Sequence, residues 1–324
     1  MEFRRFGRLG WSVSEVSYGM WGMGGDWKGP DVAEAMDALH RSVELGCNFF
    51  DTAWGYGAGT SERMLAEIIA AYPDKKLFAA TKIPPKNFKW PSRRGYALGD
   101  CFPPEHIREY TEKSLANLGV DTIDLMQFHV WEDAWASDER WQRAVNDLKS
   151  EGLVTSFGIS VNRWEPTNVV NTLRTGLIDA VQVIYNIFDQ APEDELFPLC
   201  DELNVAIIAR VPFDEGSLTG NLTKDTKWEA GDWRATYFVA ENLNASVDRA
   251  EALRPLIPEG MTMAELALRF ILAHPTVSTV IPGMRRKRHV EANIATSDGR
   301  TLPADLLAAL RRHRWDREPT RWSQ

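Results

Sequence analysis

The sequence contains little cysteine and groups no residues in the manner of a metal site. Its three cysteines, Cys47, Cys101 and Cys200, are widely spaced and form no Cys-x-x-Cys pair. They also form no cluster with the six histidines at the spacing of zinc ligands. This pattern argues against a disulfide framework and against a metal centre, and it predicts free thiols in a reducing cytosol.

Long apolar segments and an excess of positive charge are also absent. No hydrophobic run reaches the roughly 18 residues of a membrane-spanning helix. The N-terminus, MEFRRFGRLGWSV, is basic but lacks the apolar centre of a signal peptide. The net charge of −9 and the isoelectric point near 5.3 argue against a general nucleic-acid binder. We therefore expect a cytoplasmic protein that binds neither membranes nor nucleic acids, while its oligomeric state stays open.

What the chain does have is a regular alternation of strand and helix patterns. Strands are expected at residues 16–20, 48–51, 77–82, 123–128, 154–160, 180–184, 205–210 and 277–281. Helices are expected at residues 31–45, 61–70, 104–118, 138–151, 165–174, 194–203, 245–256, 262–273, 288–295 and 304–312, with Asp31 and Ser61 as N-caps. Strict alternation implies a parallel sheet with right-handed crossovers. Eight such units without a linker predict one α/β domain over residues 1–324, a (β/α)8 TIM barrel.

The two ends of the predicted barrel differ. The opening FRRFG and WSV segments are expected to pair as a small hairpin that plugs the bottom of the barrel. Long loops at residues 84–103 and 211–244 are expected at the opposite, carboxyl end of the strands. A doubly wound open sheet is the alternative fold, but GMWGMGGDW after the first strand lacks the Gly-x-Gly-x-x-Gly spacing that such a sheet favours.

Four side chains of different chemistry follow the carboxyl ends of predicted strands. Asp51 ends one strand and Tyr56 follows it after a short loop. Lys82 ends the next strand, and His129 directly follows the one after that. Because the ends of parallel strands meet at one end of a barrel, a carboxylate, a phenol, an ammonium and an imidazole should converge there.

Together these four groups predict a site for proton transfer to a carbonyl oxygen. The ammonium of Lys82 should lower the pKa of Tyr56 by about 1 to 3 from its usual value near 10. Asp51 should keep Lys82 charged, and His129 should orient the substrate oxygen by a hydrogen bond. The arrangement contains a proton donor but no hydride source.

The motifs around these residues supply the missing partner through a resemblance. DTAWGYG around Asp51 and Tyr56, TK at Lys82 and IDLMQFH before His129 resemble the aldo-keto reductases, and the likeness extends over nearly the whole chain. It implies that Tyr56 is the general acid in carbonyl reduction and the base in oxidation. It also implies a nicotinamide cofactor at the carboxyl end of the barrel, bound without a Rossmann domain.

The same resemblance implies a set of cofactor-binding residues. They are Ser160, Asn162, Gln182, Arg210, Pro212, Gly216, Leu218, Gly220, Gly283, Arg285, Arg286, His289 and Asn293. Two positions depart from the family pattern. Val161 separates Ser160 from the asparagine that usually follows it, and Arg210 stands where the family often has an aromatic ring on the nicotinamide. A planar guanidinium can also stack, although a structural ion pair is the alternative role for this arginine.

A basic cluster and the tryptophans bear on which ligands the barrel binds. RRKR at residues 285–288 suits the 2′-phosphate of NADP, so NADP(H) is expected over NAD(H), with a solvated helix end as the alternative. Among 13 tryptophans, several fall in predicted loops, Trp27 among them. Four of these are expected to line a substrate pocket rather than only pack a loop: Trp21, Trp54, Trp90 and Trp131.

The sequence therefore predicts reduction of an aldehyde, ketone or sugar carbonyl with NADPH. One alternative is a sugar or polyol dehydrogenase that works mainly in the oxidative direction with NAD(P). Another is a regulatory subunit that binds the cofactor and turns it over slowly, as the beta subunits of potassium channels resemble reductases. The substrate itself depends on the loops, where irregular structure gives no pattern to interpret.

Overall fold

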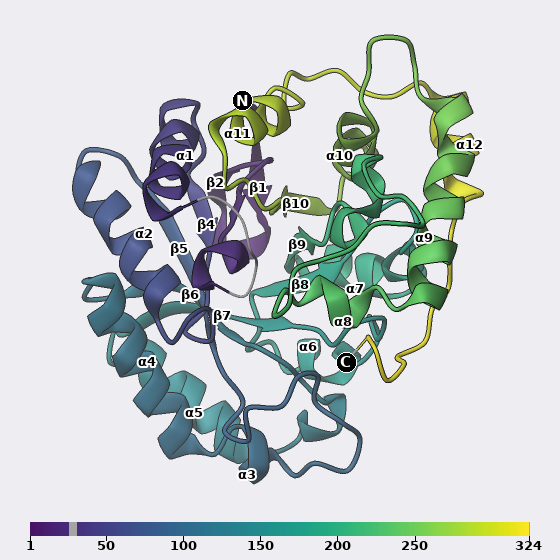
Figure 1. Ribbon diagram of the computed structural model, residues 1–324. Coiled ribbons are helices and arrows are strands. Elements are labelled where there is room, and N and C mark those ends of the chain that lie inside the picture. Colours follow the sequence, from purple (N-terminus) through teal and green to yellow (C-terminus); the bar gives the residue numbers. More distant parts are fainter. Residues whose placement is uncertain (26–30, 324) are drawn as a thin grey trace.

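The computed structural model describes residues 1–25 and 31–323, and a barrel of eight parallel strands forms its centre (Figure 1). The strands are adjacent in chain order: β3 Tyr18–Gly19, β4 Phe49–Asp51, β5 Phe78–Ile83, β6 Ile123–Phe128, β7 Val154–Ser160, β8 Ala180–Ile184, β9 Ala206–Arg210 and β10 Val277–Val280. Parallel bridges from Val16 to Val280 and from Gly19 to Gly283 join the first strand to the last. The predicted (β/α)8 barrel is confirmed.

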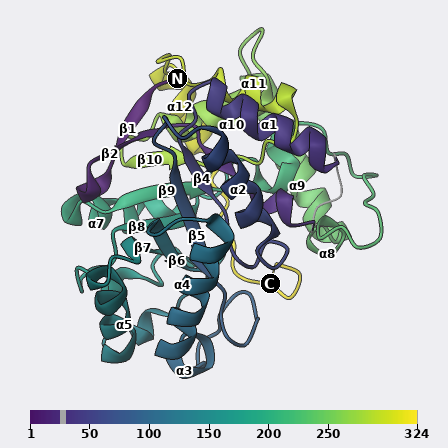
Figure 2. The same cartoon turned by 90° about the vertical axis from the view of Figure 1, so that its left-hand side faces the viewer.

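Helices cover the outside of the barrel (Figures 1 and 2). They are α1 Val32–Glu44, α2 Thr60–Ala71, α4 Pro104–Leu118, α5 Glu139–Ser150, α7 Leu196–Leu203, α9 Ala240–Leu253, α10 Met263–Leu272, α11 Lys287–Ile294 and α12 Ala304–Arg311, with the short α3 Leu98–Cys101, α6 Val170–Leu173 and α8 Arg234–Tyr237 between longer elements. The predicted N-cap of α1 is confirmed, because the carboxylate of Asp31 accepts the amide of Glu34 at 2.8 Å. Trp27 lies outside the described residues.

The predicted N-terminal hairpin is also confirmed. β1 Phe3–Phe6 pairs antiparallel with β2 Trp11–Ser14. Its aromatic rings close the amino end of the barrel: Phe6 lies 5.3 Å from Phe49, and Trp11 lies 4.8 Å from Phe78, between ring centroids. Figure 2 shows the hairpin at one end of the barrel and α8 at the other. The hairpin thus packs against the amino ends of β4 and β5.

Three local expectations were wrong. Helix α2 begins at Thr60 after Gly59, and Ser61 does not cap it, because its hydroxyl accepts a bond from Thr52 and donates to Met20. The helix expected at residues 165–174 shrinks to α6, since the side chain of Asn168 bonds the loop that follows β6 instead. The expected loop at residues 211–244 contains the 3-10 turn Asp214–Thr219 and α8, and α9 begins at Ala240, before the expected residue 245.

Residues 1–25 and 31–323 were searched for disulfides, metal sites and membrane-spanning helices. The three cysteines are buried and free. Across the same residues there is no group of three or more His, Cys, Asp or Glu side chains that could hold a metal ion. A search of those residues also finds no helix with the length and apolar character that crossing a membrane requires.

The bridge that closes the barrel should be sensitive to added volume. In Gly19→Ala the new methyl group would lie 2.6 Å from the carbonyl oxygen of Ile281, on backbone that Gly19 already bonds at Pro282. We expect a loss of about 1–3 kcal/mol in unfolding free energy, measured by urea denaturation. Gly283→Ala is the matched control, because its methyl group meets no atom within 4 Å. Equal losses in the two variants would contradict the steric cause, because only the methyl group at position 19 meets backbone atoms.

Candidate active site

The four predicted catalytic side chains meet at the carboxyl end of the barrel. Lys82, at the end of β5, places its ammonium 2.6 Å from the carboxylate of Asp51 at the end of β4. The same nitrogen lies 2.8 Å from the carbonyl oxygen of Thr52 and 3.2 Å from the hydroxyl of Tyr56. The ring of His129, which directly follows β6, lies edge-on to that of Tyr56 with 5.5 Å between centroids. Lys82 thus bridges the carboxylate and the phenol.

Two glutamines hold the free oxygen of Asp51. Gln127 on β6 donates to it at 3.0 Å, and Gln182 on β8 donates at 2.7 Å. Gln182 was expected to bind the cofactor, but its amide nitrogen donates to Asp51. Gln127 was missed in the sequence. The available signal was its place on β6 two residues before His129, which directly follows the strand, since alternate residues of an extended chain face the same side.

Burial is the largest influence on the pKa values of Tyr56 and Lys82. It raises the pKa of Tyr56, and the opposing charge of Lys82 is the smaller influence, so the expected net lowering of this pKa was wrong. Burial also lowers the pKa of Lys82, but Asp51 and Tyr56 more than offset it, and the pKa of Lys82 ends above its usual value. At neutral pH the site therefore holds a protonated phenol beside a charged ammonium.

His129 is neutral in the same environment. Burial, with the charges of Lys82 and Arg210, brings the pKa of His129 well below its usual value of 6.5. Its Nδ1 is buried and has no hydrogen-bond partner among the described residues. A neutral imidazole carries one proton, so it can donate a hydrogen bond without transferring charge.

Three of the predicted pocket tryptophans lie partly exposed at this end of the barrel, and the fourth lies in the core. Trp90 lies edge-on to His129 at 5.7 Å, and Trp21 lies 6.5 Å from Tyr56, between ring centroids. Trp54 packs on Tyr110 at 4.7 Å and remains half-buried. Trp131 differs: it is 0% exposed among aromatic core residues and its indole donates to Thr172 at 2.8 Å. The expectation that Trp131 lines a pocket is corrected, because the chain turns its ring into the core.

Predicted cofactor residues follow the ends of β7, β8 and β9. Ser160 ends β7 and pairs in register with Gln182. Asn162 turns its amide nitrogen to Glu165 at 3.0 Å and to Glu132 at 3.1 Å. Arg210 ends β9 and donates to the carbonyl oxygen of Val161 at 3.0 Å. Ser160, Gln182 and Arg210 lie on three adjacent strands, β7, β8 and β9, and Asn162 follows β7, which places these residues at one side of the barrel.

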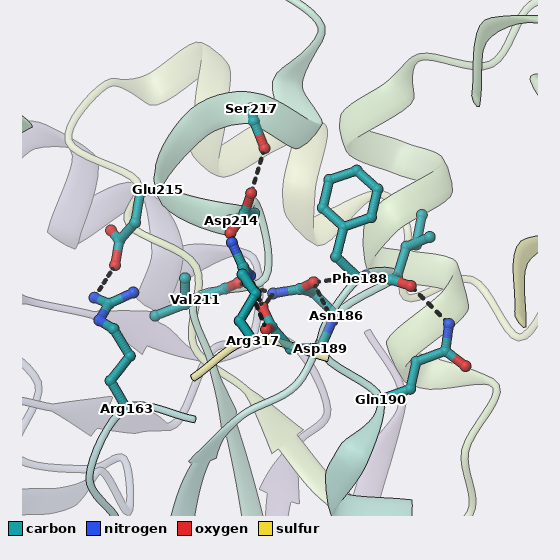
Figure 3. Close-up of polar contacts among 11 residues, drawn as sticks. Arg163, Asn186, Phe188, Asp189, Gln190, Val211, Asp214, Glu215, Ser217 and Arg317 are labelled. Carbon is teal, nitrogen blue, oxygen red and sulfur yellow. Dashed lines mark hydrogen bonds and ion pairs between the residues drawn. The ribbon is translucent and has the colours of Figure 1, made fainter. Parts of the chain in front are cut away.

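The turn after β9 carries Pro212, Gly216, Leu218 and Gly220, and buried ion pairs hold it (Figure 3). Arg163 bonds Glu215 at 2.5 Å. From the C-terminal tail, Arg317 bonds both Asp214, at 2.8 Å, and Asp189. All three carboxylates are less than 10% exposed, and Figure 3 shows Arg317 between Asp214 and Asp189.

These two arginines were not predicted. Arg163 carries no motif of its own, and Arg317 lies in a tail without a periodic pattern.

The predicted basic segment precedes and begins α11. Arg285 donates to the carbonyl oxygen of Gly22 at 3.4 Å, while Gly283 pairs with Gly19 in the barrel. Carboxylates of α1 approach the cluster, with Glu34 at 3.7 Å from Arg286 and Asp37 at 3.1 Å from Lys287. His289 is exposed and Asn293 is buried in α11. Roles in cofactor binding stay predictions for these residues.

The polar atoms left unpaired fit a nicotinamide group. Among the residues that the structure describes, His129 Nδ1, Asn162 Oδ1 and Arg210 Nε are buried and lack hydrogen-bond partners. Asn162 Oδ1 is an acceptor and Arg210 Nε a donor, which complement the NH2 and the oxygen of a carboxamide. Buried polar atoms without partners are uncommon and call for a ligand or water.

Comparisons with known proteins agree with this geometry. A family model described as the aldo/keto reductase family matches residues 15–314. The chain is 30% identical to the NADH-specific methylglyoxal reductase of Escherichia coli (strain K12), a match that covers 93% of this chain and 97% of that protein.

Two solved structures share the fold at 25% identity. The aldo-keto reductase AKR11C1 from Bacillus halodurans, in its holo form, has a TM-score of 0.78 with 100% of both chains covered. The glycerol dehydrogenase AKR11B4 from Gluconobacter oxydans has a TM-score of 0.79, with 96% of this chain and 94% of that chain covered. This chain belongs to the aldo/keto reductase family and is an NAD(P)H-dependent oxidoreductase.

Proposed function

We propose that this protein reduces an aldehyde or ketone to the alcohol, with Tyr56 as the proton donor. The observation that carries the proposal is the contact between the Lys82 ammonium and the Tyr56 hydroxyl at 3.2 Å, with Asp51 behind it at 2.6 Å. A phenol beside a fixed cation can release its proton when negative charge develops on a nearby oxygen, because the cation stabilises the phenolate.

Each residue of the site has a part in that step. The hydroxyl of Tyr56 and the neutral ring of His129 donate hydrogen bonds to the substrate oxygen and orient it. The cofactor, when bound, supplies the hydride to the carbonyl carbon. Tyr56 then gives its proton to the oxygen, and Lys82 balances the negative charge left on the phenol. Ser160, Asn162 and Arg210 would hold the carboxamide end of the cofactor.

NADP(H) is the cofactor that this proposal favours. Arg285 and Arg286 stand at the start of α11, where a phosphate would meet both positive side chains and the helix N-terminus. The carboxylates of Glu34 and Asp37 weaken this preference, since they already approach the cluster. The relative from Escherichia coli is named as NADH-specific, so the choice of cofactor requires measurement.

The aromatic side chains support an apolar substituent on the carbonyl compound. Phe88 and Trp90 are 49% and 40% exposed, with 6.3 Å between their ring centroids, and Trp90 lies beside His129. Exposed aromatic rings next to a catalytic group favour aromatic, aliphatic or stacked sugar-ring substrates. We also infer a cytoplasmic location, in keeping with the buried free thiols.

Oxidation of an alcohol by the same residues is the second candidate. In that direction Tyr56 would accept the proton, and one structural neighbour is named as a glycerol dehydrogenase. The positive charge of Arg210 favours this candidate for the reason developed below. A purely regulatory role has less support, because Lys82 bonds both Asp51 and Tyr56 as turnover requires.

Replacing the proton donor tests the proposal. In Tyr56→Phe we expect NADPH oxidation against a panel of aldehydes, ketones and sugars to fall by about 100- to 10,000-fold, because the remaining donor, the neutral ring of His129, is too weak an acid to replace the phenol. Binding of NADPH should persist. Tyr72→Phe, which bonds His40 on the outer helices, is the matched control and should keep full activity. Unchanged turnover in Tyr56→Phe would exclude Tyr56 as the donor, and faster turnover with NADH would overturn the NADP preference.

The protonation states predict a flat pH profile. The pKa of Tyr56 is raised above 10, so its proton is present up to about pH 9, and the pKa of His129 is lowered below 6.5, so its ring is neutral above that pH. We expect kcat for reduction to be constant between about pH 6.5 and 9 at saturating NADPH and substrate. A loss of rate below pH 7.5 that disappears in His129→Gln would contradict the neutral state of His129.

A further inference from the structure

Arg210 brings a positive charge to the barrel end without a carboxylate partner. Its guanidinium donates to the carbonyl oxygen of Val161 at 3.0 Å. Its Nε is buried and has no hydrogen-bond partner within the described part of the chain. No described carboxylate approaches Arg210 within the 4.0 Å of an ion pair. Arg210 is half-buried, and a partly desolvated cation without a counterion is costly, so its presence here needs a reason.

The neighbouring charges are already matched with one another. Asp51 is bonded by Lys82 at 2.6 Å, and Glu215 is bonded by Arg163 at 2.5 Å. Burial and the repulsion from Arg163 lower the pKa of Arg210 to about 10, which leaves it charged at neutral pH. With Tyr56 protonated and His129 neutral, these side chains together carry an excess positive charge.

The charge of Arg210 reaches the place of reaction. Its charge opposes the burial that raises the pKa of Tyr56 and adds to the burial that lowers the pKa of His129, so it acts on the two groups that would hold the carbonyl oxygen. A bound nicotinamide would have to bring its C4 next to the carbonyl carbon for hydride transfer, so its ring would lie in the same electric field. The oxidised ring carries one positive charge more than the reduced ring.

We propose that Arg210 makes the site discriminate between the two oxidation states of its cofactor, so that the reduced form binds more tightly than the oxidised form. The inference rests on the proposed function, because it requires a nicotinamide at this end of the barrel. In reduction, a bound nicotinamide would supply the hydride to the carbonyl carbon while Tyr56 gives its proton to the oxygen, and the oxidised ring would then carry its positive charge at the barrel end that holds Arg210. The charge of Arg210 thus promotes release of the oxidised cofactor and shifts the equilibrium on the enzyme towards alcohol oxidation.

The test compares binding of the two forms rather than turnover. Dissociation constants for NADPH and NADP+ are measured by quenching of tryptophan fluorescence in the wild-type protein, in Arg210→Met and in Arg210→Lys. We expect the ratio of the NADP+ constant to the NADPH constant to fall about tenfold in Arg210→Met, since one nearby unit charge is removed. Arg210→Lys keeps the charge and should keep the ratio. Binding of 2′-phospho-ADP-ribose, which lacks the ring, should be the same in all three proteins.

Each other outcome has a distinct meaning. Equal weakening of NADPH and NADP+ in Arg210→Met, with an unchanged ratio, would overturn the proposal, because Arg210 would then bind a part common to both forms. Failure of the wild-type protein to bind either form would instead sink the proposed function. If Arg210→Met does not fold, Glu215→Gln serves as the second variant. It removes a negative charge near Arg210, so the ratio should widen, and an unchanged ratio would again overturn the proposal.

Discussion

The buried ion pair between Lys82 and Asp51 is the interaction on which the rest of the site depends. Both side chains are at most 2% exposed, and their charged atoms lie 2.6 Å apart. Loss of either partner would leave a buried charge unpaired, at a cost of several kcal/mol. The second oxygen of Asp51 draws Gln127 and Gln182 towards it, so one carboxylate organises side chains from β5, β6 and β8. The ammonium is thereby fixed at the hydroxyl of Tyr56.

The barrel makes this arrangement possible by bringing distant strand ends together. The N-terminal hairpin closes the amino end (Figure 2). Asp51, Lys82 and Arg210 lie at or next to the carboxyl ends of β4, β5 and β9. There the turn after β9 is fixed from two sides, by Arg163 from the segment after β7 and by Arg317 from the C-terminal tail (Figure 3). The same end of the barrel thus contains three sets of paired charges, Lys82 with Asp51, Arg163 with Glu215, and Arg317 with Asp214 and Asp189. Arg210 lies at this end without a described carboxylate within 4.0 Å.

The sequence predicted the parts of the structure that depend on local patterns. Buried apolar runs between turn residues placed β6, β7 and β8 with the correct bounds, and the order of the strands brought the four catalytic types together. Prediction from the sequence failed where contacts between residues far apart in the chain determine the local structure. The side chain of Asn168 bonds the loop after β6, and no long helix forms around it. Arg317 bonds carboxylates that lie more than 100 residues away in the sequence. The pKa of Tyr56 was misjudged because burial, which the sequence does not give, outweighs the charge of Lys82.

A double-mutant cycle on Lys82 and Asp51 tests the central claim most directly. The values of kcat/KM for reduction of a carbonyl substrate are compared among the wild type, Lys82→Met, Asp51→Asn and the double variant. If the pair acts as one unit, each single change should lower kcat/KM by at least about 100-fold, and the double variant should lose no more than the worse single variant. Losses that multiply in the double variant would show that the two residues act independently and would contradict the account.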